Sequence, residues 1–317
     1  MSSDLAIIIP AFKQTFLEKT LLSLTQQTNK NFTVYVGDDR SPYNLQTICN
    51  KFKGKLSIHY HRFENNMGAK HLVNQWKRCV ELSKDEKWIW LFSDDDIADN
   101  NCVEVFYKTI EEDNGSFDIY RFNTRIINSN DTVIENTVES PSVESSFDMA
   151  MEILQFNRGN SIVDHIFSKW VYEKYNGFVY TDYAQAADWA TSILFSSEKG
   201  IYTMQGAKVN WRLSGENLSV RAAYTNKMLL GHLQFCNWLK KHFAYLKGTA
   251  EKEYRALQKN IDYNLRYVIK SHYKGLYFFM YREVYDYYAT NANTVKAFFS
   301  TVRLYSLVRL PKLFSIK

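Results

Sequence analysis

Three consecutive carboxylates stand where an apolar run of the sequence ends. Residues 87–100 read KWIWLFSDDDIADN, so that Asp94, Asp95 and Asp96 directly follow the apolar block. Two like charges about 4 Å apart repel by roughly 1 kcal/mol in water and roughly 4 kcal/mol at the effective dielectric of a protein surface. Three neighbouring carboxylates at the end of a buried segment therefore favour a bound cation.

An aspartate run is also typical of a solvated turn or a helix N-cap. The following DNNCVEVFYKTIEE predicts a helix, and Asp99 is the expected cap because its side chain can accept hydrogen bonds from the first helical turn. Asp99 alone would satisfy the helix cap, so capping does not explain the other three carboxylates. They follow residues 88–92, a short apolar block typical of a fully buried strand. We therefore interpret the run as a functional site.

Strands and helices are predicted to alternate through the first 117 residues. The predicted strands are LAIIIPAF, FTVYVGDD, LSIHYHRF and WIWLFS, and the predicted helices are residues 15–27, SPYNLQTICNKF and GAKHLVNQWKRCVELS. This order predicts βαβ units and a parallel sheet. Ligands of such sheets bind outside the carboxyl ends of the strands. Asp38 and Asp39 end the second strand, so we expect them to share a crevice with residues 94–96.

The pattern changes after residue 117. FDIYRFNTRIIN and DTVIENTVE alternate like antiparallel strands, and SIVDHIFSKWVYEKYNGF predicts a strand that enters a helix. YAQAADWATSILFSS predicts a further helix that carries Asp188. From Val220 onward the chain is expected to be helical, rich in Tyr and Phe, and basic.

Composition narrows the class of protein. The 317 residues are 45% hydrophobic, which is ordinary for a globular chain, and the net charge of +5 is too weak to imply nucleic-acid binding. Four cysteines show no metal-binding spacing and are expected to be reduced thiols of a cytoplasmic protein. No signal peptide and no window of about 18 apolar residues is predicted.

Motifs in the first two thirds of the chain resemble those of family 2 glycosyltransferases. The ordered set is AIIIPAFKQTFLEKTLLSLTQQT, VGDDRSP, NNMG, WLFSDDD, NGF and AADWA, within residues 4–219. The resemblance implies an α/β GT-A fold, the nucleotide-diphospho-sugar transferase fold, with a mostly parallel central sheet. It places the catalytic domain at residues 1–219, with a nucleotide-binding half (1–117) and an acceptor half (118–219), before a C-terminal helical region (220–317).

The same resemblance implies the reaction. The expected enzyme is an inverting, metal-dependent glycosyltransferase that moves a hexosyl or N-acetylhexosaminyl group from a nucleotide diphosphate sugar, with UDP as the expected nucleotide. The expected acceptor is a glycan or a lipid-linked molecule in polysaccharide biosynthesis. A non-catalytic module of this fold that binds nucleotide or glycan is the alternative. A sugar-nucleotide pyrophosphorylase would need a Gly-rich loop after the first strand, and IIIPAFKQ has none.

Nucleotide recognition is expected at the ends of the first two strands. By resemblance, Asp39 recognises the base beside Pro10, Ala11 and Phe12. A carboxylate can accept a hydrogen bond from uracil N3–H, and an aromatic ring can stack on the base. The alternative for Asp39 is an Asx-turn that leads into Ser41.

The family's DxD motif falls on Ser93, Asp94 and Asp95, with Ser in place of the first Asp. Asp95 then becomes the expected direct metal ligand, Asp96 a supporting acid, and Asp94 a ribose contact. Mn²⁺ or Mg²⁺ would bridge the two phosphates and offset charge on the leaving diphosphate. The cation that the three acids favour is thus expected to be shared with a nucleotide.

A phosphate contact is expected near the start of the third helix. Many relatives carry an Arg a few residues after the glycine that corresponds to Gly68, whereas this chain reads AKHLVN. Lys70 or His71 would take over the contact. The alternative for both is a solvated helix start.

The catalytic base is expected to be Asp188. It matches the acid of the family's ED motif, with Ala187 in place of Glu. A carboxylate there would take the proton of the acceptor hydroxyl, and its apolar surroundings would raise its pKa. A surface helical Asp is the alternative. Asp164 and His165 are expected on the acceptor side, although a His there can also be hydrogen-bonded in the core, and Arg212 is expected to close over the diphosphate.

The C-terminal segment VKAFFSTVRLYSLVRLPKLFSIK has five cations and no acid: Lys296, Arg303, Arg309, Lys312 and Lys317. Aromatic and aliphatic residues between cations suit an interfacial helix on an anionic leaflet. Peripheral attachment to the inner face of the membrane is the expected localisation of this cytoplasmic protein. A helix docked on the catalytic domain is the alternative.

Overall fold

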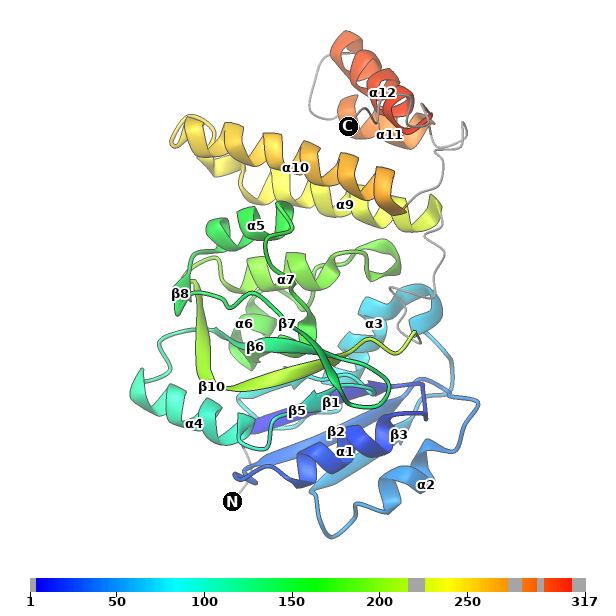
Figure 1. Cartoon of the computed structure of the whole chain (residues 1–317), viewed down its shortest axis with the longest axis vertical. Coiled ribbons are helices and arrows are strands. Elements are labelled where there is room, and N and C mark those ends of the chain that lie inside the picture. Colours follow the sequence, from blue (N-terminus) through cyan, green and yellow to red (C-terminus); the bar gives the residue numbers. More distant parts are fainter. Residues whose placement is uncertain (1–3, 216–225, 273–280, 290–293, 310–317) are drawn as a thin grey trace.

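A ten-stranded mixed sheet forms the centre of the molecule (Figure 1). The computed structural model describes residues 4–215, 226–272, 281–289 and 294–309. The strand order is β3-β2-β1-β4-β9-β6-β10-β5, with β7 beside β6 and β8 beside β10. The strands are β1 (Leu5–Ala11), β2 (Phe32–Asp38), β3 (Ile58–Arg62), β4 (Trp88–Leu91), β5 (Ile97–Ala98), β6 (Ile119–Ile127), β7 (Val133–Asn136), β8 (Val143–Glu144), β9 (His165–Ser168) and β10 (Ile201–Arg212).

The predicted parallel sheet is confirmed for its first four strands. β1 pairs in parallel with β2 and with β4, and β2 pairs in parallel with β3. Further along the sheet, β9 is antiparallel to both β4 and β6, whereas β10 runs parallel to β6. The change of direction occurs at β9, which belongs to the range 118–219 that the sequence analysis assigns to the acceptor half.

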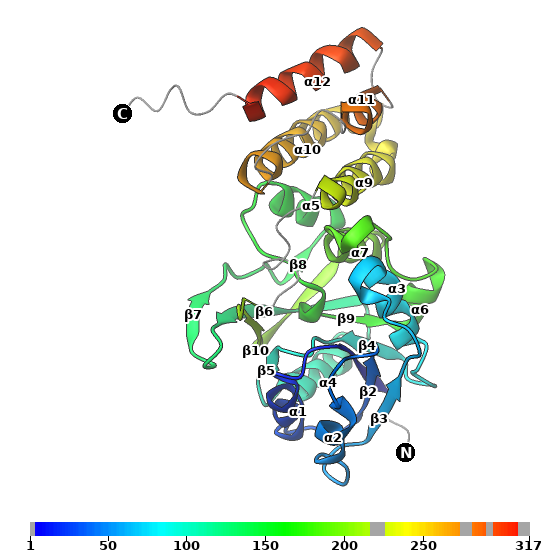
Figure 2. The same ribbon diagram turned by 90° about the vertical axis from the view of Figure 1, so that its right-hand side faces the viewer.

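Helices cover both faces of the sheet, as Figures 1 and 2 show. In β1, Leu5, Ile7 and Ile9 belong to one core and Ala6 and Ile8 to the other, because successive side chains of a strand point to opposite faces. The first core contains α1, α2 and α4, and the second contains α3, α5, α6 and α7. These helices are α1 (Leu17–Thr25), α2 (Leu45–Asn50), α3 (Gly68–Val80), α4 (Cys102–Glu112), α5 (Ser146–Leu154), α6 (Lys169–Lys174) and α7 (Ala187–Phe195), with two 3-10 turns, η1 (Ile162–Asp164) and η2 (Asp182–Ala184).

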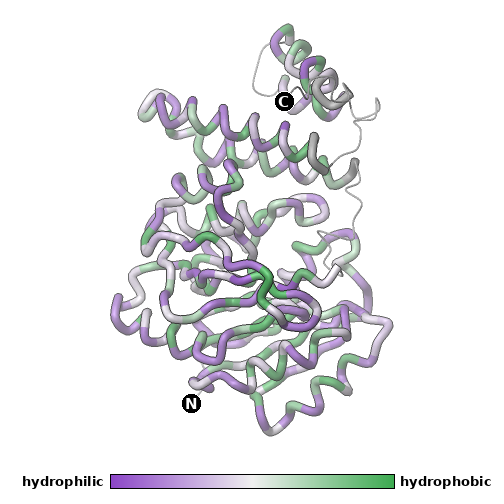
Figure 3. Tube along the Cα trace, viewed as in Figure 1, coloured by the Kyte–Doolittle hydropathy of each residue, from purple (hydrophilic) through white to green (hydrophobic). Residues whose placement is uncertain are grey.

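The C-terminal helices stack on the second face, away from β1. Helices α9 and α10 lie over α5 and α7, and α11 and α12 lie at the far end of the molecule (Figures 1 and 2). Hydrophobic and hydrophilic residues alternate along α9 and α10 (Figure 3), and their apolar residues join the second core of the sheet. The elements are α9 (Asn226–His242), η3 (Ala244–Leu246), α10 (Glu251–His272), α11 (Tyr281–Ala289) and α12 (Thr294–Arg309). The proposed boundary at residues 219 and 220 lies outside the described residues.

Two elements differ from their sequence predictions. The central strand β10 was not predicted, because its alternation is interrupted where Gly206 adopts φ 90° and the register shifts between Met204 and Lys208. The helix predicted from Tyr183 begins only at Ala187. Three residues before it adopt positive φ and cannot continue an α-helix.

The predicted cap of α4 is wrong. Asn101 occupies the N-cap position and makes no side-chain capping bond. The Asp99 carboxylate instead accepts hydrogen bonds from Arg125 Nη2 (2.6 Å) and from the backbone N–H of Lys208 (3.0 Å). Asp99 therefore ties the short β5 to β6 and β10, because an ionised carboxylate finds a stronger partner in a guanidinium than in a helix N-terminus.

Candidate active site

The carboxyl ends of β1, β2 and β4 meet at one edge of the sheet. β1 lies between the other two strands, with Ala11 opposite Asp38 and Ile8 opposite Leu91. The loops that follow these strands therefore come together. They carry most of the residues that the sequence assigns to nucleotide and metal, including Phe12, Asp39 and residues 94–96.

Lys13 is the cation that lies among the acids. Its Nζ is 3.1 Å from Asp94 Oδ1 and donates to Asp95 Oδ2, while the backbone N–H groups of Phe12 and Lys13 donate to Asp94 Oδ2 at 2.8 Å each. Burial alone would lower the pKa of Lys13, but the charges of Asp94 and Asp95 raise it above its usual value. The sequence analysis missed Lys13, although its position after Phe12 in the first loop was the available signal.

Arg212 ties the last central strand to the acidic loop. Its Nε donates to the Asp95 carbonyl oxygen (2.6 Å), and its backbone N–H donates to Asp96 Oδ1 (2.7 Å). The buried guanidinium also pairs with Asp131 (2.6 Å). Burial raises the pKa of Asp96 well above its usual value, and the charge of Asp95 raises it further. Through these contacts Arg212 holds the loop that carries residues 94–96 in place.

The residues at this edge fit a metal that arrives with phosphates. No three of the described His, Cys, Asp and Glu side chains converge as a metal cage. Asp94 is held by two backbone N–H groups as well as Lys13, and Asp96 accepts from the backbone N–H of Arg212, so Asp95 is the carboxylate with the fewest backbone bonds to lose if a cation replaces Lys13. Mg²⁺ is commonly held by one or two carboxylates together with substrate phosphates. One protein carboxylate is therefore sufficient for this kind of site.

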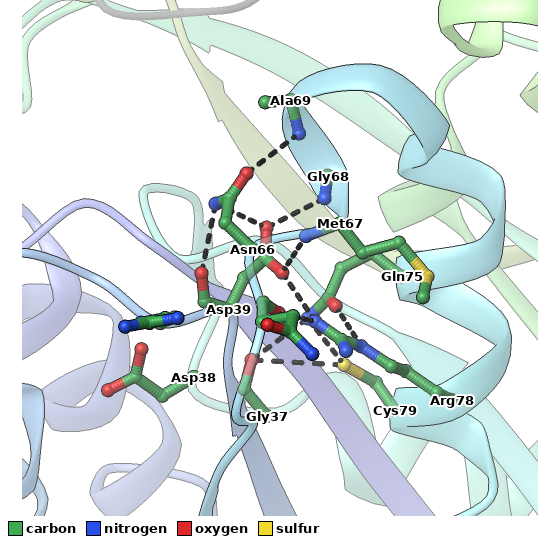
Figure 4. Close-up of polar contacts among 12 residues, drawn as sticks. Gly37, Asp38, Asp39, Asn66, Met67, Gly68, Ala69, Gln75, Arg78 and Cys79 are labelled. Atoms are coloured by element: carbon green, nitrogen blue, oxygen red, sulfur yellow. Dashed lines mark hydrogen bonds and ion pairs between the residues drawn. The ribbon is translucent and has the colours of Figure 1, made fainter.

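Asp39 anchors the start of α3 (Figure 4). Its Oδ1 accepts from the backbone N–H of Met67 (2.7 Å) and from Arg78 Nη2 (2.5 Å). Its Oδ2 accepts from Gly68 N–H (2.8 Å) and Asn66 Nδ2 (2.9 Å). A carboxylate offers about four acceptor positions, so Asp39 is fully engaged. A base could bind this carboxylate only by displacing a side chain such as that of Asn66.

Gly68 permits the close approach of the Asp39 carboxylate to the start of α3. A Cβ on Gly68 would lie 2.7 Å from Asp39 Oδ2, so a larger residue would push the carboxylate away from the helix. The turn contact to Ser41 is made by Asp38 Oδ1 (2.7 Å), and not by Asp39 as the Asx-turn alternative required. Asp38 also accepts from Arg62 Nη1 (2.9 Å). It is a structural acid.

The phosphate candidates at α3 have different environments. Lys70 is exposed on the first helical turn, whereas His71 has a non-helical backbone and its Nδ1 lies 3.0 Å from the Tyr180 hydroxyl. Arg78 of α3 was not predicted, and it pairs with Asp39. Its guanidinium carbon lies 3.8 Å from the centre of the Phe63 ring. Arg78 stands ten residues after Gly68, further along than the arginine of many relatives.

The predicted base stands at the start of α7. Asp188 is half-buried and its Oδ1 accepts from the backbone N–H of Trp189 (2.9 Å). Burial raises the pKa of Asp188 to about 7. Asp164 is buried in η1, where its Oδ2 accepts from Ser161 N–H (2.9 Å). Burial raises the pKa of Asp164 to about 7 as well, and the charge of Asp188 adds to the shift.

Asp188 and Asp164 line a cavity of about 510 Å³. The other lining residues are Thr124, Ile126, Thr137, Phe156, Gly159, Asn160, Ser161, Ala184, Gln185, Ala186, Trp189, Trp211, His232 and Val268. The charge of Asp164 also helps to raise the pKa of Asp96, so Asp164 links the field of the acidic loop to that of Asp188.

His165 does not line this cavity. It is fully buried, and its Nδ1 donates to the Ser161 carbonyl oxygen (2.8 Å). Burial lowers the pKa of His165 to about 3, so the ring is neutral. The contacts of His165 match the core alternative given for it, a buried ring hydrogen-bonded to the backbone.

Helix α9 holds the segment that leads into Asp188. Tyr183, Ala184 and Ala186 adopt φ of 58°, 53° and 55°, conformations that cost of order 1–3 kcal/mol each for residues other than glycine. Gln234 of α9 bonds Asp182 twice, at 2.8 Å to its backbone N–H and at 3.0 Å to its carboxylate. This contact supports the strained backbone from outside.

Comparisons with known proteins agree with this fold. The family model described as Glycosyl transferase family 2 matches residues 6–175. Chondroitin synthase of Pasteurella multocida is 31% identical over 114 residues, which cover 32% of this chain and 12% of that protein. The structure of S. aureus TarS with UDP-GlcNAc superposes with a TM-score of 0.70 at 12% identity, over 96% of this chain and 90% of that one. TarS with UDP gives a TM-score of 0.68 at 12% identity, over 96% and 89%.

Proposed function

This chain belongs to glycosyl transferase family 2, and we propose that it transfers a sugar from UDP to an acceptor hydroxyl with inversion at the anomeric carbon. The single observation that carries the proposal is the position of Asp188. Its carboxylate lines a cavity, and burial raises its pKa to about 7, which suits a general base at neutral pH. A UDP donor is favoured by analogy with TarS, which was solved with UDP-GlcNAc and UDP.

The reaction assigns one role to each group. Asp188 takes the proton of the acceptor hydroxyl as that oxygen bonds to the anomeric carbon. The bond from this carbon to the diphosphate breaks, and its electron pair leaves with the diphosphate. A divalent ion, Mn²⁺ or Mg²⁺, would supply positive charge on the leaving diphosphate, held by Asp95 with support from Asp96. Lys13 would contact the phosphates after its ion pair with Asp95 breaks. Asp94 holds the loop that carries Phe12 in place.

The helical region belongs to the proposed catalytic unit. We assign the catalytic domain to residues 1–219 and the helical region to residues 220–317. His232 of α9 and Val268 of α10 nevertheless line the cavity beside Asp188. The acceptor of the proposed reaction, a glycan or lipid-linked molecule, would thus meet both regions.

Nucleotide release tests the proposal. With Mn²⁺ and a panel of nucleotide sugars, we expect UDP release from at least one UDP-hexose or UDP-N-acetylhexosamine, and more release when an acceptor is added. A non-catalytic module of this fold would bind UDP without releasing it from any donor. The measurement is a coupled assay of free UDP, with donor binding followed in parallel by calorimetry.

Helix α12 supports the proposed membrane contact. No described helix is long and apolar enough to cross a bilayer. Ala297 and Leu304 of α12 are buried against neighbouring helices, whereas its opposite face is an exposed apolar stripe of Val295, Phe298, Phe299 and Val302. The helix has no acid, so its cations Lys296 and Arg303 suit an anionic surface. The further cations Lys312 and Lys317 lie outside the described residues.

Substitution of this stripe tests the contact. We expect the full chain to sediment with anionic liposomes, and the double variant Phe298→Ser, Phe299→Ser to lose at least half of this binding, because both apolar rings leave the interface. The control is Tyr245→Ser, an exposed aromatic residue outside α12. Equal sedimentation of all three proteins would contradict membrane attachment through this helix.

A further inference from the structure

The cavity beside Asp188 has aromatic walls. Trp189, Trp211 and Phe156 all line it. The Trp189 ring is fixed in place, because its Nε1 donates to the Asn160 carbonyl oxygen (3.0 Å) and its ring packs edge-on against Phe235 at 5.8 Å. Rigid aromatic faces give a flat apolar surface on which the C–H face of a sugar ring can pack. The volume of about 510 Å³ falls within the roughly 300–1,000 Å³ of small-molecule sites.

Some polar atoms in the same wall have no partner in the part of the chain that the structure describes. The side-chain Oδ1 and Nδ2 of Asn160 and the Oδ1 of Asp164 are buried, and none has a hydrogen-bond partner among the described residues. Buried polar groups are nearly always paired, so these atoms are available to a polar ligand as far as the described residues are concerned. The Asn160 amide offers two donors and an acceptor, which match neighbouring hydroxyl groups because each hydroxyl can both donate and accept.

Among the residues that the structure describes, none that lines the cavity is Lys or Arg. The lining includes two carboxylates, those of Asp164 and Asp188. Arg121, whose charge acts on Asp164, and Arg158 are not among the lining residues, and both pair with Glu144. A carboxylate or phosphate group that entered the cavity would therefore face the two acids, with no Lys or Arg among the described lining residues to contact.

We propose that this cavity binds the acceptor end of the reaction and selects an uncharged pyranose, with Asn160 as the residue that recognises its hydroxyl groups. The inference deepens the proposed glycosyl transfer and rests on it. The sugar ring packs between Trp189 and Trp211, and one of its hydroxyl groups reaches the Asp188 carboxylate. Acceptors that end in a uronic acid or a phosphodiester are rejected by the two acids.

An acceptor panel on the full-length protein tests the selection. The probes are aryl glycosides of glucose, galactose and N-acetylglucosamine, the matching aryl glucuronide, and an aryl glucoside phosphorylated at O6. We expect kcat/KM for the best neutral glycoside to exceed that for both charged probes at least tenfold. Equal or better use of a charged probe would overturn the inference while leaving glycosyl transfer intact. Failure of every donor to release UDP would instead refute the proposed function.

Substitution of Asn160 tests its role. We expect Asn160→Ala to raise the KM for the neutral acceptor about tenfold with a smaller change in kcat, and Asn160→Asp to raise it further because it adds a third acid. UDP affinity, measured by calorimetry, reports on the donor side separately. The control is Asn157→Ala, an exposed residue of the same segment that does not line the cavity. Unchanged acceptor KM in both Asn160 variants would overturn the assignment.

Discussion

Asp188→Asn is expected to slow transfer by roughly 100-fold or more at saturating donor, the usual scale for the loss of a positioned base. The amide keeps the shape of the side chain but cannot take the acceptor proton. A base acts on that proton in the transition state and contributes little to donor binding, so UDP-sugar affinity should remain near that of the parent. The measurements are the transfer rate and, separately, donor affinity by calorimetry.

The pH dependence of transfer should report the same group. Burial raises the pKa of Asp188 to about 7, and only its ionised form can accept a proton. Transfer by the parent should therefore fall as the pH drops below about 7. Asp164 lies in the same cavity wall, and burial raises its pKa to about 7 as well. The pH dependence of transfer therefore reports the titration of Asp188 and Asp164 together. Asp188→Asn should remove the acidic limb from whatever activity is left.

Two variants make this result specific. Asp85→Asn makes the same chemical change at an exposed position away from the cavity and should transfer at the parent rate. Asp164→Asn should keep much more activity than Asp188→Asn, because Asp188 is the proposed base and Asp164 is buried in the cavity wall beside it. If Asp164→Asn is the inactive variant and Asp188→Asn transfers normally, then Asp164 is the base.

The part of the site that was predictable from sequence lies at the ends of β1, β2 and β4. Those strands are short apolar runs with both faces covered, so the sequence predicts them, and Asp39 and Asp94 follow within three residues of a strand end. The positions that these acids occupy were thus predictable. Their partners were not, because Lys13 and Arg78 reach them from other elements of the chain.

The acceptor half was less predictable for a physical reason. Its cavity combines Asn160 from a loop, Trp211 from β10, His232 from α9 and Val268 from α10, which no local pattern connects. The start of α7 is delayed by a run of positive φ angles that its Ala-rich sequence does not predict. Contacts from α9 stabilise this run, so tertiary structure overrides helix propensity just before Asp188.

Asp95→Ala is expected to abolish metal-dependent UDP binding. Asp94 Oδ2 accepts from two backbone N–H groups and Asp96 Oδ1 from a third, whereas Asp95 bonds the side chain of Lys13, a partner that a divalent ion can replace. Removing it leaves the ion with phosphate oxygens and water alone. Calorimetry of UDP with and without Mn²⁺ should show a Mn²⁺-dependent signal in the parent and none in Asp95→Ala.

The matched control for this experiment is Asp99→Ala, because Asp99 belongs to the same acidic stretch but bonds Arg125 and the backbone of Lys208. Asp99→Ala should keep Mn²⁺-dependent UDP binding and lower the free energy of unfolding by about 1–3 kcal/mol, since it leaves charged and backbone donors without their acceptor. Thermal or urea denaturation measures that loss. If Asp95→Ala binds UDP and Mn²⁺ as the parent does, the metal is held elsewhere, and Lys13 with Asp95 is a permanent ion pair of the loop.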